Sequence, residues 1–226
     1  MVDVLGQLGA VSRGVRSEVI DGEPSSVQTL EQTYPSPIAD VWDAVTDPER
    51  IARWFMPVSG ELRLGGRYQL EGNAGGEVLE CEPPAGDSAR YRVTWEFGGG
   101  VTWLTVRLAA AGEGTRLELE HVARDADVPA EMGEMFGPGA TGVGWDGGLL
   151  GLALHLADQP GAGLKPDELE AWAASDEGKA FYRGAADAWG AASVANGTEA
   201  AAAQRQADAT FGFYTGTAGG SEGDEG

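Results

Sequence analysis

Apolar and polar residues alternate with a period of two through most of the first half of the chain. Residues 11–20 and 26–34 both alternate in this way, and the intervening Asp21-Gly22-Glu23-Pro24 is typical of a turn. The pattern predicts an N-terminal β-hairpin.

The period then changes to that of a helix. Ile38, Val41 and Val45 recur at helical spacing, and the Asp47-Pro48 pair suits the N-cap and first position of a second short helix. Period-two strands with glycine-rich turns follow, and we expect them at residues 61–64, 67–71, 77–82, 91–97, 101–108 and 115–123. The strand at 77–82 is expected to end before Pro83-Pro84, because proline cannot donate to a β-ladder.

An apolar helix is expected to open at Gly144-Trp145, after a loop-like segment at residues 124–141. Asp146 is expected to cap the start of this helix or to lie on the surface, since a negative charge is favoured at a helix N-terminus. The order of the segments describes an α+β fold in which a strongly curved antiparallel sheet wraps around one long C-terminal helix. Such an architecture commonly leaves an apolar cavity.

The composition becomes rich in alanine beyond Pro160, and helices are expected at residues 166–174, 176–195 and 198–213. Residues 216–226 form an acidic, glycine-rich tail that is expected to be disordered. We therefore divide the chain into a main domain at 1–160, a helical C-terminal extension at 161–215 and the tail.

The charge and composition exclude several classes of partner. The formal net charge is −21, with a pI near 4.2, which argues against nucleic acid and anionic membrane surfaces. The single cysteine, Cys81, allows no internal disulfide, and the most apolar stretch, residues 149–156, is too short to span a bilayer. The N-terminus lacks the pattern of a secretory signal, so a cytoplasmic protein is expected.

Catalytic signatures are not evident in the sequence. The two histidines, His121 and His155, lack metal-ligand spacing, and no serine lies in a Gly-flanked nucleophile elbow. We therefore expect no catalytic residue, metal or cofactor. His121 lies on the apolar face of its strand, either as a core histidine or as a polar contact to a ligand.

Aromatic and aliphatic residues on the faces that should turn toward the helix are the remaining signal. They suit either a packed core or the walls of a pocket. As a pocket, the expected ligand-binding residues are Trp54, Phe55, Tyr68, Leu70, Trp95, Phe97, Leu119, His121, Phe136, Trp145 and Leu149.

An ordered set of short motifs resembles a known family. The motifs are Pro37-Ile-Ala-Asp-Val-Trp42, Thr46-Asp-Pro48, Trp54-Phe55, Leu64-Gly-Gly66, Gly76-Glu-Val78, Glu82-Pro-Pro84, Thr94-Trp95, Gly114-Thr-Arg-Leu117, Glu120-His121 and Gly144-Trp145. Between residues 10 and 158 the chain resembles the START-like SRPBCC superfamily, and within it the bacterial relatives of the activator of heat-shock protein 90 ATPase. The alanine-rich segment after Pro166 lies outside the common domain.

The resemblance implies a helix-grip fold with a cavity between the sheet and the long helix, in a superfamily whose members carry lipids, sterols or polyketides. Three hypotheses follow. The first is binding of a small hydrophobic or amphipathic molecule in that cavity. The second is a co-chaperone-like or stress-related interaction module with a chaperone or homodimer partner, and the third is an enzyme of cyclase or hydrolase type that uses the same cavity.

Overall fold

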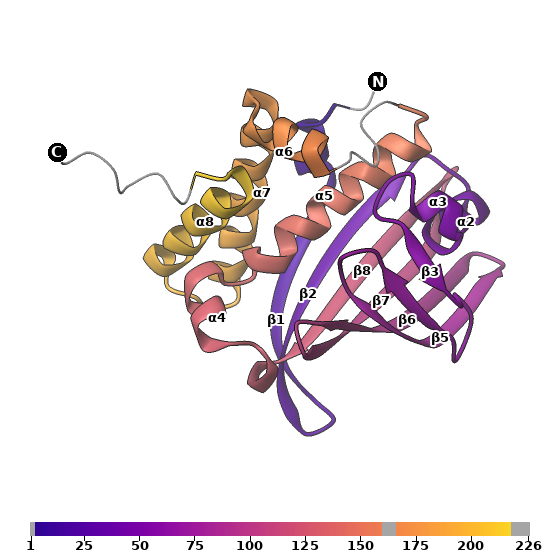
Figure 1. Ribbon diagram of the computed structural model, residues 1–226, viewed down its shortest axis with the longest axis horizontal. Coiled ribbons are helices and arrows are strands. Elements are labelled where there is room, and N and C mark those ends of the chain that lie inside the picture. The colour runs from indigo at the N-terminus through magenta and orange to yellow at the C-terminus, as the bar shows by residue number, and fades with distance from the viewer. Residues whose placement is uncertain (1–2, 160–165, 218–226) are drawn as a thin grey trace.

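The computed structural model describes residues 3–159 and 166–217, and in this part of the chain one antiparallel sheet curves around a long helix, α5 (Figure 1). The sheet has eight strands in the order β1-β2-β8-β7-β6-β5-β4-β3. The strands are β1 (Ser12–Ile20), β2 (Glu23–Tyr34), β3 (Val58–Gly60), β4 (Arg67–Leu70), β5 (Gly75–Ala85), β6 (Ser88–Phe97), β7 (Gly100–Ala111) and β8 (Gly114–Arg124). The helices are α1 (Gly6–Ala10), α2 (Ile38–Thr46), α3 (Pro48–Ile51), α4 (Ala130–Phe136), α5 (Gly139–Leu156), α6 (Pro166–Ala174), α7 (Asp176–Ala195) and α8 (Ala200–Thr215), with a 3-10 turn η1 at Asp125–Asp127.

The predicted α+β helix-grip fold is confirmed, and the alanine-rich helices form close to their expected boundaries. Helix α7 contacts α5, α8 and β1, so α5 lies between the sheet and the C-terminal helices (Figure 1). The tail that was expected to be disordered lies outside the described residues from position 218 onward. None of the helices in residues 3–159 and 166–217 is long and apolar enough to cross a membrane.

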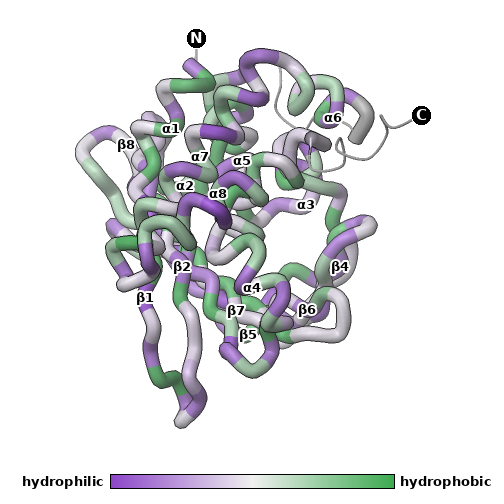
Figure 2. Tube along the Cα trace, turned by 90° about the vertical axis from the view of Figure 1, so that its left-hand side faces the viewer, coloured by the Kyte–Doolittle hydropathy of each residue, from purple (hydrophilic) through white to green (hydrophobic). Residues whose placement is uncertain are grey.

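Alternation of buried and less buried residues along β2 separates the two faces of the sheet. The β1–β2 hairpin projects from one end of the molecule (Figure 2). On the inner face, Leu104 and Val106 of β7 and Leu117 and Leu119 of β8 are buried toward α5. Each of these residues removes apolar surface from water, worth roughly 1.5–3 kcal/mol for a fully buried side chain.

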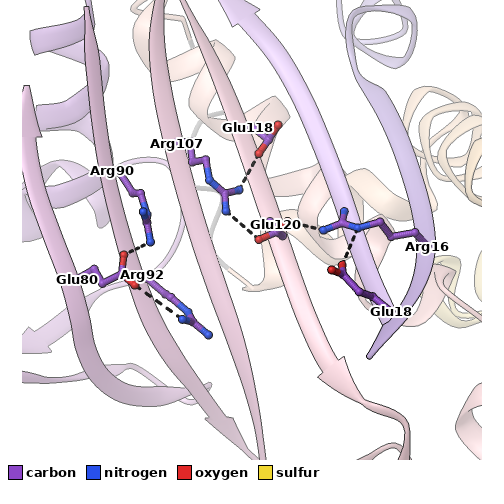
Figure 3. A network of polar contacts seen from close by, with 8 residues as sticks. All are labelled: Arg16, Glu18, Glu80, Arg90, Arg92, Arg107, Glu118 and Glu120. Carbon is purple, nitrogen blue, oxygen red and sulfur yellow. Dashed lines mark hydrogen bonds and ion pairs between the residues drawn. The ribbon is translucent and has the colours of Figure 1, made fainter. Parts of the chain in front are cut away.

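The outer face of the sheet carries paired charges instead of an apolar layer (Figure 3). Arg107 of β7 donates to Glu118 at 2.7 Å and to Glu120 at 3.0 Å, and Glu120 also accepts from Arg16 of β1 at 2.8 Å. Burial alone would raise the pKa of Glu120, but the hydrogen bonds from Arg16 and Arg107 outweigh burial and lower that pKa. This ionic face is typical of an antiparallel sheet with one side toward solvent.

Helix α5 carries a buried charge that connects three elements. Asp146 accepts hydrogen bonds from Nε and Nη2 of Arg13 in β1, the latter at 2.7 Å, and from the indole nitrogen of Trp189 in α7 at 2.8 Å. The side chains of Asp146 and Arg13 are only 1% and 6% exposed, and Nη1 of Arg13 is satisfied by the carbonyls of Leu8 and Val11. Both charged groups of the ion pair therefore have hydrogen-bond partners, which a buried charge requires.

The indole of Trp189 reaches Asp146 because the neighbouring turn of α5 contains Gly142. A Cβ atom at position 142 would lie 2.3 Å from the Trp189 ring, so only glycine allows this approach. The expectation that Asp146 caps a helix or lies on the surface is wrong. Helix α5 begins at Gly139, and Asp146 is about two turns inside it.

Three further expectations about elements are corrected. Residues Ala130–Phe136 form helix α4 where a loop was expected, and the strand expected at 61–64 is replaced by β3 at Val58–Gly60. Strand β5 continues through Pro83-Pro84 to Ala85, with an irregular register between Glu82 and Ala85. Its partner β4 pairs only with the start of β5, so the prolines lie on a free edge where no N–H donor is needed.

Replacing one partner of the buried ion pair should strongly destabilise the protein. Arg13→Met leaves Asp146 unpaired and Asp146→Leu leaves Arg13 unpaired, so each single variant should lose about 3–5 kcal/mol of unfolding free energy. The double variant should be more stable than either single one, because two apolar side chains leave no buried charge. Urea unfolding of all four proteins measures this, and additive losses in the double variant would contradict the assignment.

Candidate ligand cavity

An inner cavity of about 130 Å³ lies between the curved sheet and α5. Its walls come from strands β4 to β8, from α2 and the segment after α3, and from α5. Besides expected residues, the walls include Val78, Cys81, Tyr91, Val93, Leu104, Val106, Leu117 and Leu152. Space of this size in an apolar wall holds a small ring or the end of an alkyl chain, since a cavity of about 150 Å³ can accommodate benzene.

Two hydroxyl groups at the edge of the inner cavity are bonded to backbone carbonyls. Tyr68 donates its hydroxyl to the carbonyl of Thr94 at 2.7 Å, and Thr46 donates to the carbonyl of Trp42 at 2.7 Å. Burial raises the pKa of Tyr68 and Tyr91 well above the usual range, so both phenols stay neutral. The cavity therefore offers contact area rather than charge.

An outer groove of about 730 Å³ runs along another face of α5, toward α6, α7 and α8. Gly144, Gly147 and Gly148 of α5 line it, and a Cβ atom at position 147 would meet nothing within 4 Å. Each glycine costs a helix about 1 kcal/mol relative to alanine. Here the missing side chains leave room along the helix.

A layer of aromatic rings separates the inner cavity from the outer groove. Trp54, Phe55, Trp95 and Trp145 line both spaces. The ring of Trp145 stacks on Phe55 with centroids 6.3 Å apart and meets Trp95 edge-on at 5.0 Å. Phe55 lies in the turn after α3 and has no polar atom on its side chain, so only packing holds its ring in place.

His121 fixes one of these rings from the groove side. The indole N–H of Trp145 donates to Nδ1 of His121 at 3.2 Å, so the imidazole proton is on Nε2, which lies 2.7 Å from Oγ1 of Thr102. The Thr102 hydroxyl in turn donates to the carbonyl of Trp95 at 3.3 Å. Both imidazole nitrogens are thus used to position Trp145 and Trp95.

The sequence matches the family described as "Activator of Hsp90 ATPase homolog 1-like protein" over residues 35–156, more than half of the chain. The chain belongs to this family. It has the START-like SRPBCC fold that the motifs indicated.

Two solved structures of CalU16 from Micromonospora echinospora are similar over most of the chain. The crystal structure has 31% identity and a TM-score of 0.60, covering 81% of this chain and 98% of CalU16. The solution structure has 32% identity and a TM-score of 0.65, covering 83% and 97%. An Hsp90 activator from Plasmodium falciparum, at 22% identity and a TM-score of 0.39 over 46% of this chain and 74% of its own, is too distant to carry an argument. A comparison with curated protein sequences gives no match.

Within this family fold, the residues expected at the site fall into three places. Trp54, Phe55, Tyr68, Leu70, Trp95, Leu119, Trp145 and Leu149 line the inner cavity. Phe97 and His121 line the outer groove. Phe136 lies at neither, because its ring packs against Phe213 of α8 with centroids 5.6 Å apart.

The contribution of the C-terminal helices to the groove was not predicted from the sequence. Trp172, Tyr182 and Tyr214 line it from α6, α7 and α8. The signal was a set of large aromatic residues in otherwise alanine-rich helices. In the described part of the chain, no cluster of three or more His, Cys, Asp or Glu side chains is placed to hold a metal ion.

The burial of His121 makes stability depend on pH. Burial lowers the pKa of His121 to about 4, against about 6.5 in the unfolded chain, so the unfolded state binds the proton more tightly. The stabilisation that comes from burying neutral His121 is fully present above pH 6.5 and is lost as the pH falls from 6.5 to 4. The largest possible loss of unfolding free energy is roughly 3 kcal/mol.

Urea unfolding from pH 7 to pH 4 should therefore show a shallower loss of stability for His121→Gln than for the wild type. His155→Gln, which changes the other histidine, should keep most of the steep loss. Parallel curves for the wild type and His121→Gln would contradict the assignment.

Proposed function

We propose that the protein binds a small hydrophobic or amphipathic molecule, with an apolar end in the inner cavity and the remainder in the outer groove. The observation that carries the proposal is that the same aromatic layer lines both spaces. Phe55 is the ring of this layer that has no polar atom, so we expect its ring to move when a ligand enters both spaces. The ligand-binding residues would then be those of the aromatic layer together with Tyr68, Leu70, Leu119 and Leu149.

The size and chemistry of the two spaces support binding of this kind. The groove falls within the range of about 300–1,000 Å³ that is usual for small-molecule sites, which are mostly apolar with few polar groups. The inner cavity removes a further hydrophobic group from water, worth roughly 0.8 kcal/mol for each CH₂ buried.

The bonding of His121 favours binding over catalysis. An acid–base mechanism would need a titratable group within hydrogen-bond reach of the ligand. Both nitrogens of His121 are engaged by Trp145 and Thr102, and no carboxylate is among the described residues that line the inner cavity. In the outer groove, the carboxylate of Glu177 is bonded to the indole of Trp172. The cyclase or hydrolase hypothesis is therefore weaker than the binding hypothesis.

A protein partner is the second candidate, since the family description names activation of the Hsp90 ATPase. The feature that supports it is a group of exposed apolar side chains on neighbouring helices, with Met132 and Met135 on α4 and Phe213 on α8. Methionine is common at adaptable binding surfaces. Met132 and Met135 line neither the inner cavity nor the outer groove, whereas Phe213 also lines the groove, so variants of the two methionines test this candidate independently of the ligand site.

Gly148→Leu should weaken ligand binding. Position 148 lines both spaces, and a Cβ atom there would be 3.6 Å from the Phe55 ring, an ordinary contact. The longer leucine side chain would fill the passage and displace ligand carbon. Loss of two buried CH₂ groups weakens binding by about tenfold. Titration with the neutral fluorescent probe N-phenyl-1-naphthylamine measures the affinity.

Gly133→Leu is the matched control. Gly133 is also a helical glycine, but it lines neither space. A Cβ atom at position 133 would meet nothing within 4 Å, so a leucine fits there. Both substitutions raise helix propensity, so a difference between them reports the site. Absence of probe binding to the wild type, or equal affinity of the two variants, would refute the proposal.

A further inference from the structure

The end of the outer groove nearest the C-terminal helices differs chemically from the rest. Trp172 of α6, Tyr182 of α7 and Tyr214 of α8 line it side by side. The ring centroids of Trp172 and Tyr182 are 5.5 Å apart, and those of Tyr182 and Tyr214 are 5.3 Å apart. Three helices thus bring aromatic rings together in one corner.

Two carboxylates accompany these rings. Glu168 of α6 and Glu177 of α7 line the same groove, and Glu177 accepts a hydrogen bond from the indole nitrogen of Trp172 at 3.1 Å. That bond fixes the carboxylate beside the aromatic rings without neutralising it, because an indole N–H carries no formal charge.

The described part of the groove lining carries charge of one sign. Among its described lining residues, Glu168 and Glu177 are the charged side chains, and neither lysine nor arginine is present. The basic residues of α7 lie outside the groove, and Arg183 is paired with Asp187 and Asp208. Glu177 therefore places a carboxylate beside the aromatic rings of this corner.

We propose that this corner binds the cationic head of an amphiphile, an ammonium group attached to an apolar chain. Aromatic rings attract a cation within about 6 Å of the ring centre, by roughly 0.5–2 kcal/mol depending on exposure. The carboxylate of Glu177 adds charge attraction. The inference rests on the proposed function, because the apolar chain of the ligand uses the site described above.

The path from the corner to the inner cavity suits such a molecule. Tyr214 lies over Gly144, with its hydroxyl 3.0 Å from where a Cβ atom would be. From there the open position at Gly147 leads along α5 to Gly148, where a Cβ atom would lie 3.6 Å from the ring of Phe55. A chain laid along these glycines would have its head at the aromatic corner and its tail at the inner cavity.

Three probes with the same ten-carbon tail test the proposal: decyltrimethylammonium, 1-decanol and decanoate, all used below the concentrations at which they aggregate. Each competes with N-phenyl-1-naphthylamine on the full-length protein. We expect the ammonium compound to bind about tenfold more tightly than the alcohol, and decanoate to bind most weakly.

Glu177→Gln separates the site from the overall negative charge of the protein. It should weaken binding of decyltrimethylammonium about threefold and leave 1-decanol unchanged. Glu113→Gln removes the same unit of charge from the turn between β7 and β8, outside the groove, and should change neither affinity.

The outcomes distinguish the two claims. Equal affinity for all three probes would keep the proposed function and overturn the cationic head site. Equal weakening by Glu177→Gln and Glu113→Gln would also overturn it, because general attraction would then explain the preference. Failure of every probe to bind would refute the proposed function itself.

Discussion

Asp146 lies inside α5 with its charge met by Arg13 of β1 and Trp189 of α7, and the positions of the sheet and the outer helices depend on that contact. A carboxylate at this depth is tolerated only when paired and hydrogen-bonded. The pairing therefore fixes the rotation of α5 about its axis. With this rotation set, the glycines at 144, 147 and 148 line the groove, and Trp145 lines both the groove and the inner cavity.

Much of the fold could be predicted from local patterns. Alternation in residues 91–97 and 101–108 identified β6 and β7, and the Asp47-Pro48 pair identified the start of α3, where the Asp47 side chain accepts from the Arg50 amide. The aromatic layer was also accessible, because Trp54, Trp95 and Trp145 belong to segments whose inward faces follow from periodicity. These features depend on residues close together in the sequence.

Features that depend on distant residues were not accessible. Asp146 can be buried because its partners, Arg13 and Trp189, lie 133 and 43 positions away in the sequence. The need for glycine at position 142 follows only from the Trp189 ring that packs against it. The aromatic corner is assembled from three helices that periodicity describes separately. In each case the sequence contains the residue types, but tertiary packing decides which of them meet.

The chain has one cysteine, and the fold places it on the wall of the inner cavity. Cys81 lies on β5, half-buried and beside Tyr91 across the strand pair. Its thiol is thus a natural reporter of occupancy, because a molecule that fills this space would slow the reaction of the thiol with a small alkylating reagent. The modification rate of unmutated protein, followed by mass spectrometry, would register whether that space is filled.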